Sequence, residues 1–471
     1  MAKHRRLLII LLIPVATAVL TIAAAGWFDL VGSNLEFTSP SIRFVEVPRG
    51  VGTTPVSLLV EVRDEGAGLN ELSVRAIQGS QKKELFSTTF ENKKFAPVRI
   101  EFRGEESQLL EGQVQIEVRA KDSSMLGNTS LASLPLRVDY RRPKVVPLVA
   151  PTVIKAGSTQ LVFYKVFDED LGLSGVKVGT ETFLGFPARS LDGDLQDSAL
   201  FVAFFTVPLG ESKAFPAIRL FAEDIVGNAI SELLSTRVLP RAVTGRSIEV
   251  SDEYLRQFVE PLARGYLAQL TGQALFDPST AFQFVHAQLR QFNEDQLIAR
   301  LEESPRFDRY WQDFFSTPRG RERMAFGDEL EFRQQSQTLT RIRNNSLIVD
   351  LPQGVSTVEA VNAGVVVLAE NLGFFGRVVA LDHGLGISSV YTNLESILVS
   401  RGEQVIQGQT IGTAGQSWYA SNMQLQLQMR VHGTPVDPSE WVDRGWYGSQ
   451  IEGRINDVKR ALGLAVLQPL R

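Results

Sequence analysis

The chain has 471 residues, of which 44% are apolar and 21% charged, so its length and composition fit a globular protein of several domains. Its formal net charge of −5 gives no electrostatic basis for binding nucleic acid. The absence of cysteine excludes a thiol enzyme, a cysteine-ligated zinc site and a lipoprotein acylated on cysteine.

A long uncharged run lies near the start of the chain. Residues 7–28 are sufficient to cross a hydrocarbon core as one helix. Basic residues precede the run and Asp29 follows it, which predicts that residues 1–6 are cytoplasmic and the rest extracytoplasmic. The alternative is a cleaved signal peptide, because Ala23–Ala25 resemble a cleavage site, although the run is longer than a usual signal. The anchor interpretation predicts a single-pass protein of the inner (cytoplasmic) membrane with its bulk in the periplasm.

Short strands punctuated by Gly, Pro and Asp dominate the next two hundred residues. In residues 114–120, polar and apolar side chains alternate, so a strand there has one apolar face. The region also repeats, because residues 62–74 align without a gap on residues 166–178. We therefore predict two tandem β-sandwiches, 37–143 and 144–245, that resemble the immunoglobulin-like modules of bacterial surface proteins.

Acidic residues recur at equivalent places in the two copies. Asp122 and Asp224 each precede a Gly-Asn pair, and Asp64 matches Asp168. Aspartate before Gly-Asn favours a turn. Calcium binding between the domains is the alternative, but no run of closely spaced carboxylates supports it.

A helical period replaces the strand period in residues 250–315, which are predicted to form a short α-helical segment. Three helices are expected, beginning after Ser251, at Asp277-Pro278 and at Asn293. His286 is expected to be a packed or surface residue, since no second ligand stands at metal-binding spacing on its face. The residues predicted to face inward are Leu255, Phe258, Val259, Leu262, Phe282, Val285, Leu289, Leu297, Ile298 and Leu301.

Residues 424–428 read Gln-Leu-Gln-Leu-Gln. In a strand, this alternation places Gln424, Gln426 and Gln428 on one face. Met423, Leu425 and Leu427 occupy the other face. We expect the second face to be core and the first to be an amide-lined surface.

The stretches around this strand carry a resemblance. In order, 358–360, 364–367, 376–384, 391–394, 402–412 and 433–438 resemble the lysostaphin-type (LytM-type) zinc endopeptidases of bacterial cell walls. The resemblance implies an antiparallel β domain over residues 316–441, about a quarter of the chain. The predicted fold is therefore multidomain and mainly β, with an N-terminal transmembrane helix, two sandwiches, a helical segment and this C-terminal domain.

The resemblance also implies where zinc would bind. In that family, a His-x-x-x-Asp pair and the second histidine of a His-x-His strand hold the metal. The first of those pairs falls on Asn344 and Ile348, and the second on Gln424 and Gln426. A further catalytic histidine, in a Tyr-x-His-Leu motif, falls on Asn393.

This departure decides the predicted chemistry. A catalytic zinc site needs about three nitrogen, sulfur or carboxylate ligands, which neutral amides do not provide. Asp350 lies near Ile348, but its use needs a register slip and leaves the site short of ligands. We expect no zinc or other cofactor and no catalytic residue. The former zinc positions, together with Gln428, are predicted to line a groove.

The remaining residues of interest have structural interpretations. His383 falls in an Asp-His-Gly turn of the family pattern, and His432 in a hairpin turn before Gly433. Residues 442–471 are predicted to form a C-terminal amphipathic helix packed on the protein. The alternative for this helix is lipid contact through Lys459 and Arg460.

Three functions compete. The first is a non-catalytic, membrane-anchored envelope protein that binds peptidoglycan or regulates a cell-wall amidase or other hydrolase; some relatives that lost their zinc ligands activate amidases. The second is an active metalloendopeptidase with ligands drawn from Asp350, Asp382, His383 or His432. The third is a structural subunit of an envelope complex.

Overall fold

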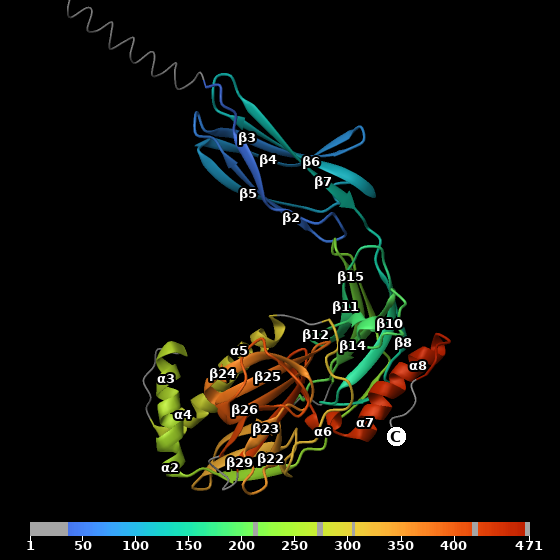
Figure 1. The fold of residues 1–471 in the computed structure, drawn as a ribbon. Coiled ribbons are helices and arrows are strands. Elements are labelled where there is room, and N and C mark those ends of the chain that lie inside the picture. Colours follow the sequence, from blue (N-terminus) through green and yellow to red (C-terminus); the bar gives the residue numbers. More distant parts are fainter. Residues whose placement is uncertain (1–35, 211–214, 271–276, 304–306, 417–422, 467–471) are drawn as a thin grey trace, which may run out of the picture. The chain divides into compact units, whose positions relative to one another are not determined.

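The computed structural model describes residues 36–210, 215–270, 277–303, 307–416 and 423–466 (Figure 1). The predicted transmembrane segment, residues 7–28, lies outside the described residues. Within the described part of the chain, no helix is long and apolar enough to span a membrane. The fold is mainly β with a few short helices, as predicted. The chain divides into two compact units, residues 1–142 with 223–229 and residues 143–222 with 230–471.

The first unit consists of two antiparallel sheets that share one core. Alternation creates that core: in β6, Val114, Ile116 and Val118 are buried and the polar residues between them are not. The three-stranded sheet contains β1 (Ser41–Glu46), β2 (Val56–Arg63) and β5 (Phe95–Phe102), in the order β1-β2-β5. The four-stranded sheet contains β3 (Leu69–Gln78), β4 (Gln81–Lys93), β6 (Gly112–Asp122) and β7 (Thr129–Val138), in the order β4-β3-β6-β7.

Residues 144–239 form a second pair of sheets. The order β12-β11-β15-β16 repeats the order β4-β3-β6-β7 of the first pair, in line with the sequence repeat. One sheet contains β8 (Lys144–Val149), β10 (Gln160–Phe167), β13 (Phe186–Pro187) and β14 (Leu200–Phe205). The other contains β11 (Leu171–Val178), β12 (Glu181–Leu184), β15 (Ile218–Asp224) and β16 (Ala229–Leu233). Two short strands, β9 (Val153–Lys155) and β17 (Arg237–Leu239), pair in parallel, and η1 (Ala188–Ser190) is a 3₁₀ turn.

The repeated aspartates close equivalent turns. Asp122 accepts a hydrogen bond from the Asn128 side chain at 2.8 Å, and Asp224 from the Asn228 side chain at 2.7 Å. Glu36, Asp64 and Asp122 also bring carboxylate oxygens within 4.8 Å of one another. Sequence spacing did not indicate this cluster, because its members come from three separate segments of the chain.

Among residues 250–270, 277–303 and 307–315, which the structure describes, the helical segment has two continuous helices rather than the three predicted. The first comprises α2 (Asp252–Tyr254), the π-helical η2 (Leu255–Val259) and α3 (Glu260–Leu270). The second comprises α4 (Pro278–Phe284), the π-helical η3 (Val285–Leu289) and α5 (Arg290–Glu302). Asn293 lies inside α5, so its expected role as a helix start is wrong. Phe258 is 60% exposed instead of buried, because the packed stripe follows Leu255 and Val259.

Two further sheets form the C-terminal region. One holds β18 (Gly245–Glu249), β20 (Glu329–Gln334) and β21 (Gln337–Arg343). The other is antiparallel and runs in the order β19-β22-β29-β28-β26-β25-β24-β27, with β23 on β28 and β30 on β29. Its strands are β19 (Arg321–Met324), β22 (Leu347–Asp350), β23 (Thr357–Glu359), β24 (Gly364–Asn371), β25 (Arg377–Gly384), β26 (Ile387–Ile397), β27 (Gln404–Val405), β28 (Thr410–Gln416), β29 (Met423–Val431) and β30 (Thr434–Val436); η4 (Gly373–Phe375) connects β24 to β25.

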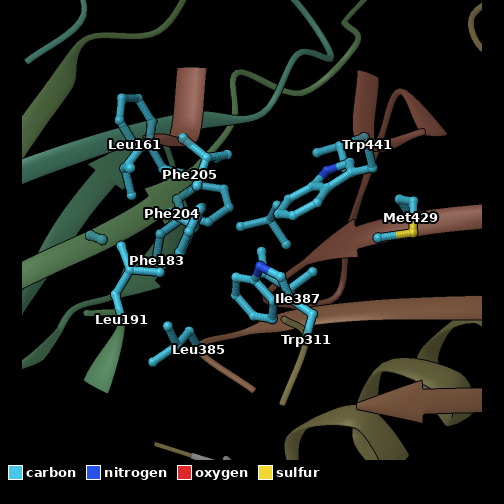
Figure 2. Packing of buried hydrophobic residues seen from close by; sticks show 14 of the residues in the cluster. Leu161, Phe183, Leu191, Phe204, Phe205, Trp311, Leu385, Ile387, Met429 and Trp441 are labelled. Atoms are coloured by element: carbon cyan, nitrogen blue, oxygen red, sulfur yellow. The ribbon is translucent and has the colours of Figure 1, made fainter. Parts of the chain in front are cut away.

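One hydrophobic core joins the second sandwich to the C-terminal sheet (Figure 2). Phe204 of β14 lies 6.1 Å, between ring centroids, from both Trp311 and Trp441. The tail helices α6 (Pro438–Trp441), α7 (Arg444–Tyr447), the π-helical η5 (Gly448–Glu452) and α8 (Gly453–Ala461) complete this core. Lys459 of α8 pairs with Asp192 and Asp194, so it faces the protein rather than lipid.

Candidate functional site

Strand β29 lies at the centre of the candidate site and fixes which residues can meet there. Gln426 stands opposite Ile348 of β22 on one side and opposite Thr392 of β26 on the other. The Thr392 hydroxyl donates to Gln426 Oε1 at 3.2 Å. Asn393 follows Thr392 in β26. The pairing register therefore brings together positions from three separate parts of the sequence.

Five of the six predicted groove residues line one cavity of about 260 Å³: Asn344, Ile348, Asn393, Gln426 and Gln428. The sixth, Gln424, is fully buried and does not line it. Instead, Gln424 donates through Nε2 to Asp350 Oδ1 at 2.7 Å. The structure therefore gathers the predicted residues into one site and leaves Gln424 beside it.

The face that the glutamine alternation predicts as an amide-lined surface is largely covered. Gln424 is fully buried, Gln428 is 3% exposed and Gln426 is half-buried, and the chain's own helical segment lies against the groove. Tyr254 of α2, Val285 and His286 of η3 and Arg290 of α5 line the same cavity from the opposite side. In Figure 1, α3 and α4 lie beside the sheet that contains β24 and β26. Met423, predicted to be core, is 40% exposed at the beginning of β29.

Individual amides in the groove have different partners. Asn344 donates to the carbonyl oxygens of Ala325 and Ser346, at 2.8 and 2.6 Å, so its side chain holds a turn. Asn393 has a backbone φ of 59°, and its buried Nδ2 finds no acceptor among the described residues. Gln424 Oε1 and His286 Nδ1 also have no hydrogen-bond partner within the part of the chain that the structure covers. The groove thus contains polar atoms that are poorly satisfied in this conformation.

Arg430 anchors the helical cover to the sheet. Its side chain is fully buried, and it contacts both carboxylate oxygens of Glu294 in α5, at 2.5 and 3.0 Å. It also donates to Gln428 Oε1 at 2.6 Å and to the Gly433 carbonyl at 2.8 Å. Sequence reasoning missed this residue, although Arg430 continues the alternation of the glutamine face by one step. Its ion-pair partner has no sequence signal.

His286 lies in an aromatic cluster between the helical cover and the sheet. The imidazole packs against the rings of Phe282, Phe332 and Phe374, with centroids 4.1, 5.0 and 5.3 Å away. Burial, together with the positive charge of Arg290, lowers the pKa of His286 to about 3. The ring is therefore a neutral packing residue, one of the two roles expected for it.

The alternative metal donors are engaged in structural contacts. Asp350 accepts from Gln424 and pairs with Arg323 at 3.3 Å. His383 bonds the Ala363 carbonyl at 2.7 Å and the Ser389 hydroxyl at 2.8 Å, and burial lowers its pKa to about 4.

His432 has a φ of 46° in the turn before Gly433, and burial lowers its pKa to about 4. Asp382 accepts from the Gly384 amide at 2.8 Å. Among the described residues of the C-terminal region, no three His, Asp or Glu side chains bring ligand atoms together. Amides and an aliphatic side chain at the family's ligand positions do not fit zinc.

Comparison with known proteins agrees with the resemblance. Residues 344–438 match the Peptidase family M23. A segment of 87 residues is 38% identical to the uncharacterized protein NMB1333 of Neisseria meningitidis, covering 18% of this chain and 14% of that one. A segment of 112 residues is 34% identical to the murein hydrolase activator EnvC of Escherichia coli, covering 24% of this chain and 26% of that one.

A third relative is the stage II sporulation protein Q of Bacillus subtilis, which is 34% identical over 89 residues. That match covers 18% of this chain and 31% of the relative. This chain therefore spans less than a third of the length of each of these three relatives. The predicted recognition of a LytM-type domain in the C-terminal region is confirmed.

Proposed function

We propose, from the Peptidase family M23 domain that this chain carries at residues 344–438, that it is a non-catalytic cell-envelope protein that regulates a cell-wall hydrolase. One observation carries the proposal: the family's ligand positions hold amides and Ile348, and these residues line a groove instead of a metal centre. The murein hydrolase activator EnvC, which is similar over the M23 region, supports the same direction.

The groove is the proposed docking site for the hydrolase. Asn393, Gln426 and Gln428 offer amide donors and acceptors there, and Asn393 Nδ2 has no acceptor among the described residues. Because the helical segment covers these groups, docking requires that the cover move away. A partner's polar groups can then form hydrogen bonds with groove atoms, such as Asn393 Nδ2, that have no partner in the covered state.

Membrane anchorage is part of the proposal. Residues 7–28 are long and apolar enough to span a bilayer, and basic residues precede them. A periplasmic-activity reporter fused after Asp29 is expected to be active. Activity of a cytoplasmic reporter at the same fusion point would overturn the proposed location.

The function is tested with the purified full chain, dye-labelled peptidoglycan and a purified cell-wall amidase. The chain alone is expected to release no dye, and the amidase is expected to release dye faster when the chain is added. Excess zinc is expected to leave the melting temperature almost unchanged, because a tight ligand of the native state would raise it by mass action.

Other outcomes select the competing functions. Dye release by the chain alone that a chelator abolishes would establish the metalloendopeptidase. If the chain co-sediments with peptidoglycan but does not change the amidase rate, its function is wall binding and not hydrolase regulation. Neither binding nor stimulation, with co-purification of envelope proteins, would favour a structural subunit.

A further inference from the structure

Large apolar side chains are exposed together at one end of the first unit. Phe37 is 81% exposed, Met125 74% and Leu126 50%. Met125 and Leu126 lie in the turn between β6 and β7, at residues 123–128. The Asn128 side chain donates to the Glu36 carbonyl at 2.7 Å, which places Phe37 beside this turn. We call Phe37, Met125 and Leu126 the apolar tip.

The turn itself does not require these residues. In the first copy, Asn128 comes six positions after its bonded partner Asp122, whereas in the second copy Asn228 comes four positions after Asp224. Both turns close through the same Asp–Asn hydrogen bond. The first turn is therefore two residues longer, and its added length presents apolar side chains to solvent. Exposed clusters of this kind mark contact surfaces.

The chain that precedes the described residues indicates what this surface contacts. Only residues 29–35 separate the apolar run ending at Phe28 from Glu36. Seven residues span at most about 25 Å, even fully extended. If residues 7–28 cross the bilayer, the end of the unit that holds Glu36 is confined near the membrane surface.

We propose that the apolar tip inserts into the outer interface of the bilayer that anchors the chain. Apolar side chains at an interface enter the boundary between headgroups and acyl chains, at a depth of about 5–10 Å. The charged groups nearby are the cations Lys94 and Lys121, the exposed Glu65 and the carboxylates of Glu36, Asp64 and Asp122. Negative groups outnumber positive ones there, so apolar contact rather than charge drives insertion. The inference rests on the proposed membrane anchor. It adds a second membrane contact that orients the first unit.

The absence of cysteine allows a direct test. The full-length chain carrying Leu126→Cys is labelled with an environment-sensitive dye and reconstituted into phosphatidylcholine vesicles that contain spin-labelled lipid. Leu110→Cys is the matched control, because Leu110 is 64% exposed and precedes the other end of the 11-residue strand β6. The two ends of that strand are about 33 Å apart. Met125→Cys provides a second site at the tip, and circular dichroism checks that each variant is folded.

The expected result is a blue shift and loss of most emission at positions 126 and 125, with a quencher near the headgroups more effective than one at the bilayer centre. Position 110 is expected to show neither. Equal quenching at all three positions in protein that floats with the vesicles overturns the inference and leaves the anchor in place. A blue shift without lipid quenching means a protein contact and also overturns it. Protein that does not float with the vesicles shows that the anchor has failed, and the inference fails with it.

Discussion

At the residue scale, Arg430 beside the groove carries a buried positive charge that must be compensated by an opposite charge and hydrogen-bond acceptors. The side chain is fully buried, and a buried cation is tolerated when its charge is paired and its donors are satisfied. Glu294, Gln428 and the Gly433 carbonyl together meet that need. Because Glu294 belongs to α5, the ion pair holds the helical cover against the buried charge of Arg430.

The first prediction concerns this ion pair. Glu294→Ala leaves the Arg430 charge buried and unpaired, so it should lower the free energy of unfolding by about 3–5 kcal/mol. Asp295→Ala is the matched control, since Asp295 is the exposed neighbour and its loss should change stability by less than about 0.5 kcal/mol. Urea denaturation of the full chain measures both. Equal effects of the two substitutions would mean that the ion pair contributes nothing specific.

Glu440 is a second residue with an unusual environment. It accepts hydrogen bonds from the Ser158 hydroxyl at 2.5 Å and the Thr159 amide at 2.9 Å, at the junction of the second sandwich and α6. Burial, with a smaller contribution from the nearby Asp437, raises its pKa to about 7, although these two hydrogen bonds and the charge of Arg241 oppose the rise. Protonated Glu440 is therefore the form that the fold prefers.

The second prediction follows from the sign of this shift. The folded pKa lies above the usual value of 4.5, so the stability that Glu440 contributes is fully present below pH 4.5 and is lost as the pH rises to about 7. Glu440→Gln mimics the protonated form at every pH. Relative to wild type, the variant should gain about 3 kcal/mol in unfolding free energy between pH 4 and pH 8.

The buried histidines do not affect the difference in unfolding free energy between wild type and the Glu440→Gln variant. Their pKa values are lowered by burial, so they destabilise the fold only as the pH falls below 6.5, and they do so equally in wild type and variant. Urea denaturation at pH 4, 6 and 8 measures the difference. A constant difference between the two proteins across this range would contradict the assigned environment of Glu440.

At the scale of elements, the helical segment decides whether the groove can be reached. Leu289 of η3 is fully buried in the core between the helices and the sheet. Asn293 of α5 accepts a hydrogen bond from the Phe374 amide at 2.8 Å, which fixes α5 against η4. The cover is thus held by apolar packing, by a few hydrogen bonds and by ion pairs that include Glu294–Arg430 and Arg300–Glu370.

The third prediction tests whether the cover controls docking. Leu289→Ala removes buried packing worth about 2–5 kcal/mol, which raises the population of uncovered groove. Amidase affinity, measured by surface-immobilised binding, should rise about tenfold for each 1.4 kcal/mol by which the cover is weakened. Gln291→Ala, an exposed position of α5, is the control and should leave the affinity unchanged.

A second substitution separates the groove from general loosening. Adding Gln426→Ala to Leu289→Ala should reverse the gain, because Gln426 offers its amide to the partner. Gln424 is unsuitable for this purpose, since it is buried on Asp350 and its loss should destabilise the fold by about 1–3 kcal/mol. If Leu289→Ala leaves amidase affinity unchanged, the groove is not the docking site.

At the scale of the whole molecule, the cores do not follow the predicted domain boundaries. The first unit has a core of its own. The second sandwich and the C-terminal sheet share one core, to which Phe204, Trp311 and Trp441 all contribute (Figure 2). Arg241, just beyond β17, adds a largely buried ion pair with Asp437 at 2.6 Å.

The fourth prediction is that the chain divides into two folding units rather than three domains. Residues 37–142 expressed alone, and residues 143–471 expressed alone, should each melt cooperatively. Residues 144–245 alone should not, because their separation exposes Phe204 and its neighbours to water. Calorimetry of the three fragments measures this. A cooperative transition from the isolated second sandwich would show that the shared core is dispensable.

The sequence alone determined the local features. Alternation of side chains predicted β6 and β29, because strand faces follow directly from a period of two. The repeated Asp–Gly–Asn turns predicted two similar arrangements of strands, and the motif pattern identified the M23 domain. The positions of Asn344, Ile348 and Asn393 in one site followed from the family pattern and not from their own chemistry.

Only the tertiary structure decided which of these surfaces is exposed. Alternation states that the face holding Gln426 is polar, but it does not state what lies against that face. The answer depends on where Glu294 and His286 are carried by helices more than a hundred residues earlier, and such long-range contacts leave no local pattern. The shared core has the same cause: Phe204 and Trp441 are each typical of a buried residue, and nothing in either segment indicates that they are buried against each other.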